Sequence, residues 1–301
     1  MTRPRAPRWS SKSLGSKAGH LFFNLLVKNG GILPAYAILF PVVFWYTLRP
    51  TVRARSLPYL HRRFPQYGIF RLWLACLRLN LSFGMVLLDR MIFRILKRGT
   101  ILSQEWDDRH IRELLEQRKG LIVLSGHMGA WQTGIAGLSV AGVPINVVLL
   151  QEQGNVDTHF FETGSSGPAV NIINPASPFG GMVDMLRALR RNEIVCVMGD
   201  RYLPGDSNIL NVPLFGDDIP VPIFPYAVAS ASGAPVSVMA TFREGPCTVR
   251  AHVLDSFRIP PEVGKNQEAC LPYAQRFAGT MERLALLCPY QFFNFYDMWR
   301  K

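Results

Sequence analysis

The sequence predicts an α/β fold in which helices flank a mixed sheet, and three observations lead to it. Beyond residue 120, short apolar runs rich in branched side chains alternate with longer segments of helical period. A glycine-bracketed turn joins the first of these runs, 121–125, to the helical segment that follows. No internal repeat, low-complexity tract or clear linker interrupts the alternation, so these elements are expected to share one domain.

The expected strands are short and apolar, and they cover residues 120–125, 144–151, 169–173, 194–198, 235–242 and 248–254. The helices expected between and after them cover residues 130–141, 180–191, 223–232 and 267–287. Two further helices precede the first strand. A long amphipathic helix is expected over 69–97, and a charged surface helix over 104–118 is expected to stop at Gly120, a residue that suits a helix C-terminus.

The excess positive charge of the chain lies in its N-terminal third. Residues 1–88 contain 13 Lys and Arg residues and no Asp or Glu, whereas the other 213 residues carry 20 basic and 21 acidic side chains. A segment that is both basic and apolar suits an anionic membrane surface. Nucleic acid is the other anionic partner, but it ranks lower because the arginines are interleaved with long aliphatic runs.

The N-terminal segments are expected to lie at a membrane. Residues 1–19 resemble a mobile, basic tail that faces it, and residues 31–47 carry no charge. At 17 residues the uncharged run is at the lower limit for a membrane span, and Pro34 and Pro41 interrupt it. A helix or broken helical hairpin in the interface therefore fits better, and a buried core helix is the alternative. We expect residues 1–60 to form this tail and membrane-associated segment, and residues 61–301 to form the α/β domain.

Several classes of site find no support in the sequence. Five cysteines without a C-x-x-C pair indicate free thiols in a reducing compartment. There is no G-x-S-x-G elbow, P-loop, dinucleotide fingerprint or H-E-x-x-H motif. His110, His159 and His252 show no metal-ligand spacing, so no metal or cofactor is implied.

His127 is the first candidate for chemistry. It follows the expected strand 121–125 and lies between Gly126 and Gly129, at the carboxyl end of a strand, where α/β sheets commonly bind ligands. Gln132 lies one turn into the next helix and is placed to reach back towards the ring. The alternative is a core histidine at a turn, but the glycine setting and the partners downstream favour function.

A second candidate group follows the expected strand 194–198. Gly199, Asp200 and Arg201 stand at its carboxyl end, and the guanidinium of Arg201 offers a planar fork for phosphate or carboxylate. The alternative is an Asp200–Arg201 pair that only fixes the loop.

Two further blocks allow both a structural and a lipid-binding interpretation. The prolines of 219–225 predict a stiff turn into a small-residue helix, which is scaffold or a wall for an acyl chain. The aromatic residues of 289–299 would seal a lipid-binding groove or cap the core.

The His127 block resembles the signature of the lysophospholipid acyltransferase superfamily, in which a His is followed by four residues and then by an acid. Together with the blocks near 194–216, 219–238 and 289–299, it is most similar to the bacterial lipid A biosynthesis (late) acyltransferase family. The resemblance implies an acyltransferase-like α/β fold at the cytoplasmic face of a bacterial inner membrane, held peripherally or monotopically. It also implies transfer of a fatty acyl group from acyl carrier protein or coenzyme A to a hydroxyl or amine of a lipid acceptor.

In that family the His is the general base and the acid orients and charges it, which assigns catalysis to His127 and to position 132. The resemblance assigns Gly129, Asp200 and Arg201 to substrate binding. Position 132 is Gln, so three explanations stay open. Gln132 orients a slower base, another acid serves (Glu152, Asp157 or Asp200), or the position was altered and the enzyme is weakened.

Backbone amides near 126–129 are expected to stabilise the oxyanion of the tetrahedral intermediate. The competing functions are a non-catalytic lipid-binding or assembly protein on the same fold, and an esterase or thioesterase in which water replaces the acceptor.

Overall fold

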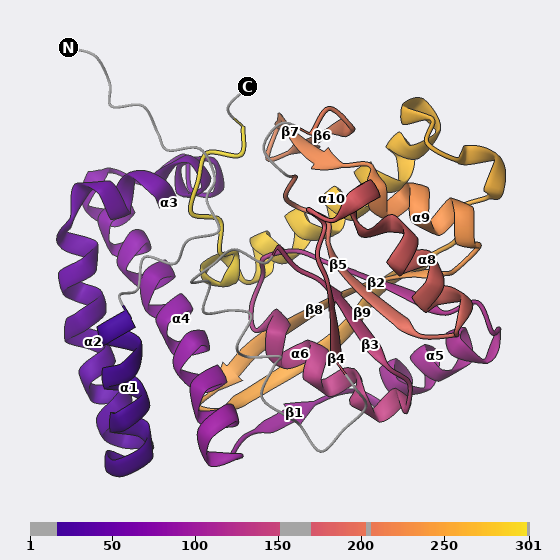
Figure 1. The fold of residues 1–301 in the computed structure, drawn as a ribbon. Helices are drawn as coiled ribbons and strands as arrows, with labels where there is room; N and C mark the ends of the chain where they lie inside the picture. Colours follow the sequence, from indigo (N-terminus) through magenta and orange to yellow (C-terminus); the bar gives the residue numbers. More distant parts are fainter. Residues whose placement is uncertain (1–16, 151–169, 203–205, 300–301) are drawn as a thin grey trace.

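The computed structural model of the chain describes residues 17–150, 170–202 and 206–299. A seven-stranded mixed sheet with helices on both faces forms its centre, and four N-terminal helices gather beside it (Figure 1). The α/β class and the flanking helices predicted from the sequence are confirmed. The basic tail expected over 1–19 lies outside the described residues up to position 16.

The sheet has the strand order β1-β9-β8-β2-β5-β3-β4. Its strands are β1 (Thr100–Leu102), β2 (Leu121–Ser125), β3 (Ile145–Val148), β4 (Val170–Ile173), β5 (Ile194–Met198), β8 (Val236–Gly245) and β9 (Thr248–Phe257). β2 runs parallel to both of its neighbours, β5 and β8, while β8 and β9 form an antiparallel hairpin. All six strands expected in the sheet are present, although β3 ends at Val148, before the limit expected for it.

Helices cover both faces of the sheet because the central strand is apolar on both sides. Ile122 and Leu124 of β2 pack into a core with α8 (Met182–Arg190), α9 (Phe224–Ser232) and α10 (Gln267–Leu287). Leu121 and Val123 pack on the opposite face with α5 (Glu105–Glu116) and α6 (Trp131–Gly137). This two-sided burial explains the unbroken apolar run of β2. The single helix expected over 130–141 is α6 followed by a short 3₁₀ turn, Leu138–Ala141.

The structure corrects the proline-rich turn expected over 219–225. Its first half is a strand, β7 (Asp217–Pro222), which pairs with β6 (Ile209–Leu214) in a two-stranded antiparallel ribbon. Only Pro225 enters α9 at its first turn. The prolines concealed the ribbon because proline cannot donate to a ladder, but a two-stranded ribbon has free edges that tolerate it.

The N-terminal helices are α1 (Lys17–Gly30), α2 (Ile32–Leu48), α3 (Pro50–Arg63) and α4 (Ile69–Leu96). α2 is one helix with Pro41 inside it, so the chain does not break within 31–47. A buried stripe of Ala35, Leu39 and Val43 shares a core with Leu88 and Ile92 of α4. The boundary expected at residues 60–61 falls inside α3, and the division into two units stays a prediction.

One helix of the described residues, α4, is long and apolar enough to cross a membrane, with a mean hydropathy of 1.5 over its best stretch. Since 44% of that stretch is buried within the protein, core packing also accounts for its composition. α2 and α3 together pass the same test, but they meet at 87°. Among the described residues α4 is therefore the helix that passes this test by itself, and the interfacial location expected for 31–47 stays a prediction.

A buried polar cluster fixes these helices to the sheet. Arg243 of β8 donates from Nε to Oδ2 of Asp89 in α4 at 2.7 Å, and the hydroxyl of Tyr36 in α2 donates to the same carboxylate. Asp89 is 1% exposed, so this ion pair is shielded from water, and breaking it would leave a buried charge. The position of α2 and α4 relative to the sheet is thereby set.

Candidate active site

His127 and Asp200 meet at the carboxyl edge of the sheet. β2 and β5 are adjacent and parallel, and Ser125 pairs with Met198, the last residue of each strand. His127 and Asp200 each lie two residues beyond these partners, so the strand register brings them together. Nδ1 of His127 donates to Oδ1 of Asp200 at 2.8 Å.

A second contact makes the pair rigid. The backbone N–H of His127 donates to Oδ2 of Asp200 at 2.9 Å, so the carboxylate holds both the ring and the main chain of the histidine. Asp200 is 3% exposed, whereas the His127 side chain is 22% exposed. The arrangement buries the acid and presents the base to the outside.

The charge of Asp200 is stabilised where it lies. Burial by itself raises the pKa of this carboxyl, but the charge and hydrogen bond of the His127 ring, the charge of Arg201 and the His127 backbone N–H outweigh burial and lower the pKa. Asp200 is therefore a carboxylate at neutral pH. A carboxylate that accepts from Nδ1 fixes the tautomer in which the ring lone pair is on Nε2.

The turn that carries His127 is closed by contacts with β8 and with the C-terminal segment. The N–H of Met128 donates to the carbonyl of Gly126 at 2.7 Å, which makes a γ-turn around His127. Gly129 has φ +53°, and a Cβ there would lie 2.0 Å from the carbonyl oxygen of Thr241. Only glycine allows this approach. The structure thus gives Gly129 a packing role, and its part in substrate binding stays a prediction.

Residues 291–293 run alongside the turn. Phe293 N–H donates to the carbonyl of His127 at 2.9 Å, and Gly129 N–H donates to the carbonyl of Gln291 at 2.7 Å. The side chain of Gln291 in turn bonds both the N–H and the carbonyl of Arg243 in β8, at 2.8 and 3.0 Å. Gln291, which sequence reasoning missed, therefore ties the turn to the sheet; its only signal was its place inside an aromatic block.

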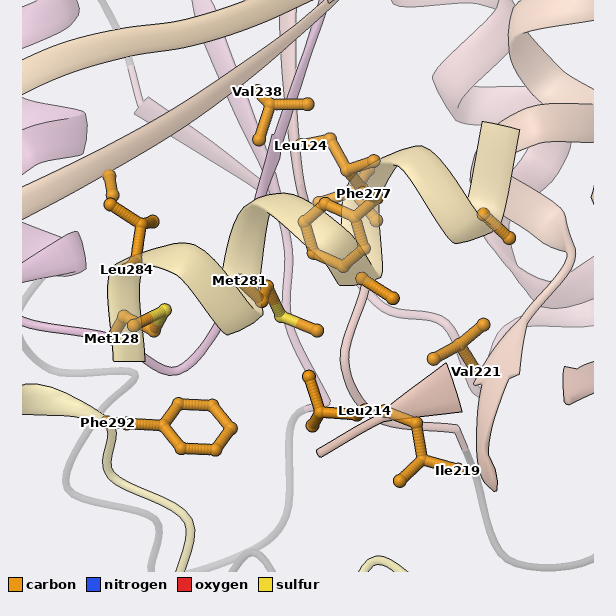
Figure 2. Packing of buried hydrophobic residues seen from close by; sticks show 14 of the residues in the cluster. Leu124, Met128, Leu214, Ile219, Val221, Val238, Phe277, Met281, Leu284 and Phe292 are labelled. Carbon is orange, nitrogen blue, oxygen red and sulfur yellow. The ribbon is translucent and has the colours of Figure 1, made fainter. Parts of the chain in front are cut away.

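Figure 2 shows the apolar floor under this turn. Met128, the residue after His127, lies beside Leu284 of α10 and above Phe292, and Met281 lies next to them. Met128 is 1% exposed and Phe292 is fully buried. The histidine is thus held from below by the main core, while its ring stays at the surface.

The expected oxyanion role of the backbone amides of 126–129 is wrong for three of the four positions. The N–H groups of His127, Met128 and Gly129 donate to Asp200, Gly126 and Gln291 within the protein. Because these N–H groups already donate hydrogen bonds within the protein, they are not free to stabilise the negative charge that develops on the substrate oxygen.

Gln132 lies in the first turn of α6 and is 6% exposed. Its neighbour Trp131 faces the His127 ring edge-on, with centroids 6.1 Å apart. Of the three acids considered as alternatives to Gln132, Asp200 contacts Nδ1 of the histidine. Glu152 and Asp157 lie outside the described residues.

Arg201 stays at the same edge, against the C-terminal segment. Its Nη2 donates to the carbonyl of Phe293 at 3.2 Å, and its guanidinium carbon lies 5.5 Å from the ring centroid of Tyr296. The Asp200 carboxylate, which the alternative interpretation paired with Arg201 alone, accepts from the His127 ring, and the charge of Arg201 helps to lower its pKa.

A small, mostly apolar cavity of about 20 Å³, enough for little more than a water molecule, lies between α6 and the sheet. It reaches Ser125 and Met198 at the ends of β2 and β5, and Trp131 beside His127. Its deeper walls are formed by apolar side chains of α6, β3 and β8, including Ile135, Val147 and Met239. Among the residues that the structure describes, no group of three His, Cys, Asp or Glu side chains could hold a metal ion.

All five cysteines are free, as the sequence predicts, and four of them are buried.

A comparison with curated proteins found no match. The family model of the bacterial lipid A biosynthesis acyltransferases matches residues 65–301, which covers everything from the start of α4 onward, including the sheet and the His127 turn. Enzymes of this kind transfer an acyl group to a lipid acceptor. The family resemblance found in the sequence is thereby confirmed, and the chain belongs to the bacterial lipid A biosynthesis acyltransferase family.

Proposed function

We propose that this chain moves a fatty acyl group from a thioester donor to a hydroxyl or amine of a lipid acceptor, with His127 as general base and Asp200 as its acidic partner. The observation that carries the proposal is the hydrogen bond of 2.8 Å between His127 Nδ1 and the buried Asp200 carboxylate. A base oriented by a third group is the arrangement that activates hydroxyl nucleophiles on many folds.

In the proposed reaction Nε2 of His127 takes the proton of the acceptor as its oxygen or nitrogen attacks the thioester carbonyl carbon. The bond from acceptor to carbonyl carbon forms first, and the tetrahedral intermediate then collapses with cleavage of the carbon–sulfur bond. The imidazolium returns its proton to the departing thiolate, which leaves as the free thiol. Asp200 stabilises the imidazolium between these steps, and no acyl-enzyme is needed.

An apolar lining lies beside Trp131. It begins at the ends of β2 and β5, where His127 and Asp200 follow, and it is mainly aliphatic. The cavity itself, at about 20 Å³, is too small to enclose a fatty acyl chain. We propose that the acyl chain of the donor packs against the outer end of this lining, because an apolar chain gains free energy by leaving water.

The acyl donor is a thioester of acyl carrier protein or coenzyme A, both of which are found in the reducing cytoplasm that the free cysteines suit. The contact between Asp200 and the histidine supports an active enzyme over a weakened or non-catalytic protein, because an acid is present beside the ring although position 132 is Gln.

The test supplies the purified protein with acyl carrier protein or coenzyme A thioesters, each with and without lipid acceptor. Acylated lipid formed only when the acceptor is present supports the proposal. Equal thioester hydrolysis without acceptor would identify a thioesterase, and lipid binding without any turnover would identify a non-catalytic protein.

Arg201 is proposed to hold a phosphate or carboxylate of a substrate, since its charge lies beside Asp200 at the site edge. Arg201→Lys is then expected to raise the Michaelis constant with little change in kcat, because lysine lacks the bidentate fork. Steady-state kinetics and thermal unfolding of the same preparation check this. A lowered unfolding temperature with unchanged kinetics would leave Arg201 a structural residue that supports Phe293.

We propose that the N-terminal helices attach the protein to the cytoplasmic face of the bacterial inner membrane. The outer side of α2 is apolar and exposed, with Leu33 81%, Phe40 51% and Trp45 62% exposed. Its inner side already packs on α4, so the exposed side chains have no core to enter. Apolar side chains gathered on one side of a surface helix indicate a membrane or protein contact.

Replacing Leu33, Phe40 and Trp45 with serine is expected to shift the protein from the membrane pellet towards the soluble fraction, because the three side chains lose their burial in lipid. Phe179→Ser serves as the matched control, since Phe179 is 80% exposed and follows β4, the far edge strand of the sheet. Fractionation of cells followed by immunoblotting measures the shift. Unchanged pelleting of the triple variant would contradict attachment through α2.

A further inference from the structure

Three stacked aromatic rings with a guanidinium near each of them lie at the corner between α3 and α4. We call this set the arginine ladder, and it consists of Arg63, Phe64, Tyr67, Arg71, Arg78 and Tyr290. Phe64 stacks on Tyr67 with ring centroids 4.5 Å apart and an interplanar angle of 6°. It also stacks on Tyr290 at 5.9 Å, which joins the ladder to the segment that leads to the His127 turn.

Each arginine of the ladder is placed by a ring. The guanidinium carbon of Arg63 lies 4.5 Å from the Phe64 centroid, that of Arg71 lies 5.9 Å from Tyr67, and that of Arg78 lies 5.8 Å from Tyr290. Contact with a ring orders the guanidinium groups of Arg71 and Arg78 without using their N–H donors, which stay available for oxygen ligands. Arg71 and Arg78 are exposed.

Among the described residues the arginines of the ladder make no ion pair, whereas the neighbouring Arg62 pairs with Asp217 at 2.8 Å. No acidic residue occurs before Asp89, and no carboxylate of the described residues pairs with Arg63, Arg71 or Arg78. Arg63 donates instead to the carbonyls of Ala285 and Leu286, the last turn of α10, at 3.1 and 2.9 Å. An ordered basic cluster without carboxylates is complementary to an anion.

Exposed apolar side chains surround this charge. Ile69 and Phe70 precede Arg71 and are 91% and 72% exposed. Leu286, whose carbonyl accepts from Arg63, and the next residue, Leu287, are 48% and 78% exposed. Figure 1 shows α3 crossing the end of α2 and α4 beside the yellow C-terminal segment. The hydrogen bonds from Arg63 to Ala285 and Leu286 join the end of α3 to the end of α10. A water-exposed surface gains nothing from large apolar side chains next to arginines, whereas a bilayer interface accommodates both.

We propose that the arginine ladder is a headgroup site that binds the phosphates of anionic phospholipids, with Ile69, Phe70 and Leu287 entering the lipid beside it. The site goes beyond the attachment proposed for α2, because the exposed side of α2 carries no charge and does not distinguish between lipids. The ladder adds a preference for negatively charged membranes. The proposed headgroup site rests on the proposed membrane location. The arginine ladder has no part in the acyl-transfer reaction itself.

The test compares vesicles of phosphatidylcholine with vesicles that also contain phosphatidylglycerol, using the full chain purified in mild detergent and flotation to measure binding. The ladder variant is Arg71→Gln with Arg78→Gln. The control is Arg112→Gln with Arg190→Gln, two exposed arginines on α5 and α8 that make the same change in net charge.

The native protein is expected to bind phosphatidylglycerol vesicles more tightly at low salt, and salt is expected to weaken this preference. The ladder variant is expected to lose about thirtyfold of that preference, roughly fivefold for each arginine, while its binding to phosphatidylcholine stays the same. Equal loss in the control variant, or an undiminished preference in the ladder variant, would overturn the proposal.

Two further measurements keep the outcome separate from the proposed reaction. Acyl transfer in detergent solution is expected to be the same in the native and ladder variants, so failure of the enzyme proposal leaves the binding result valid. Binding of acidic acyl carrier protein is measured in parallel. Its loss in the ladder variant, with the phosphatidylglycerol preference kept, would make the ladder a protein-docking surface and refute the headgroup site.

Discussion

Replacing His127 with alanine is expected to lower kcat for acyl transfer by roughly 10²–10⁴-fold, the range that general-base catalysis supplies. The ring is the only part of the pair that faces outward, and Asp200 behind it is buried. The fold should persist, because the core contacts of this turn belong to Met128 and not to the ring. Acyl transfer from thioester to lipid acceptor, measured at saturating substrate, checks the loss.

A second histidine of the same domain provides the control. His252 lies near a buried carboxylate as well, with Nδ1 3.9 Å from Oδ2 of Asp107, and its side chain is 30% exposed. His252→Ala is expected to keep its activity because His252 lies on β9, which β8 separates from β2 in the sheet. Comparable losses in both variants would show that the effect of His127→Ala is structural.

Asp200→Asn is expected to cost about 10⁴ in kcat, the loss seen when an amide replaces the carboxylate of a serine protease triad. Asparagine keeps the size of the side chain but removes the charge that stabilises the imidazolium. Its amide also competes with the Nδ1–H tautomer, because it presents a donor as well as an acceptor. Steady-state kinetics with unchanged thermal unfolding would confirm a catalytic effect.

Gln132→Glu is the complementary experiment, and it separates the two candidates for the acid. Since Asp200 already contacts Nδ1, a carboxylate at position 132 is expected to give no gain, and its burial at 6% exposure is expected to lower stability. The double variant Asp200→Asn with Gln132→Glu should stay inactive. If the double variant instead regained acyl-transfer activity, position 132 would be the place of the acidic partner of His127.

The parts of the site that depend on local pattern were predicted correctly. The run 121–125 is a buried strand, and His127 follows it in a turn that Gly129 permits. Strand β5 was equally clear, and Asp200 follows it as expected. Each of these elements could be predicted because the period of apolar residues and the position of a glycine are visible within a short stretch of sequence.

The contact between the two parts of the site, His127 after β2 and Asp200 after β5, could not be derived from local sequence patterns. The contact between His127 and Asp200 requires that β2 and β5 be neighbours in register, although β3 and β4 separate them along the chain. The position of Gln132 drew attention to a partner within one helical turn, whereas the observed partner is 73 residues away. Sheet order is decided by packing of the whole domain, which no local pattern contains.

The turn that carries His127 is held by hydrogen bonds to residues that are translated much later. Thr241 of β8 receives the N–H of Ala130 at 2.6 Å, and Gln291 and Phe293 close the other side. When β2 and its turn emerge from a ribosome, none of these partners has been translated. Contacts across such separations form slowly and late. The sheet can begin to assemble during synthesis, but the site becomes competent only in a nearly complete chain, when the N-terminal helices have long been available to the membrane.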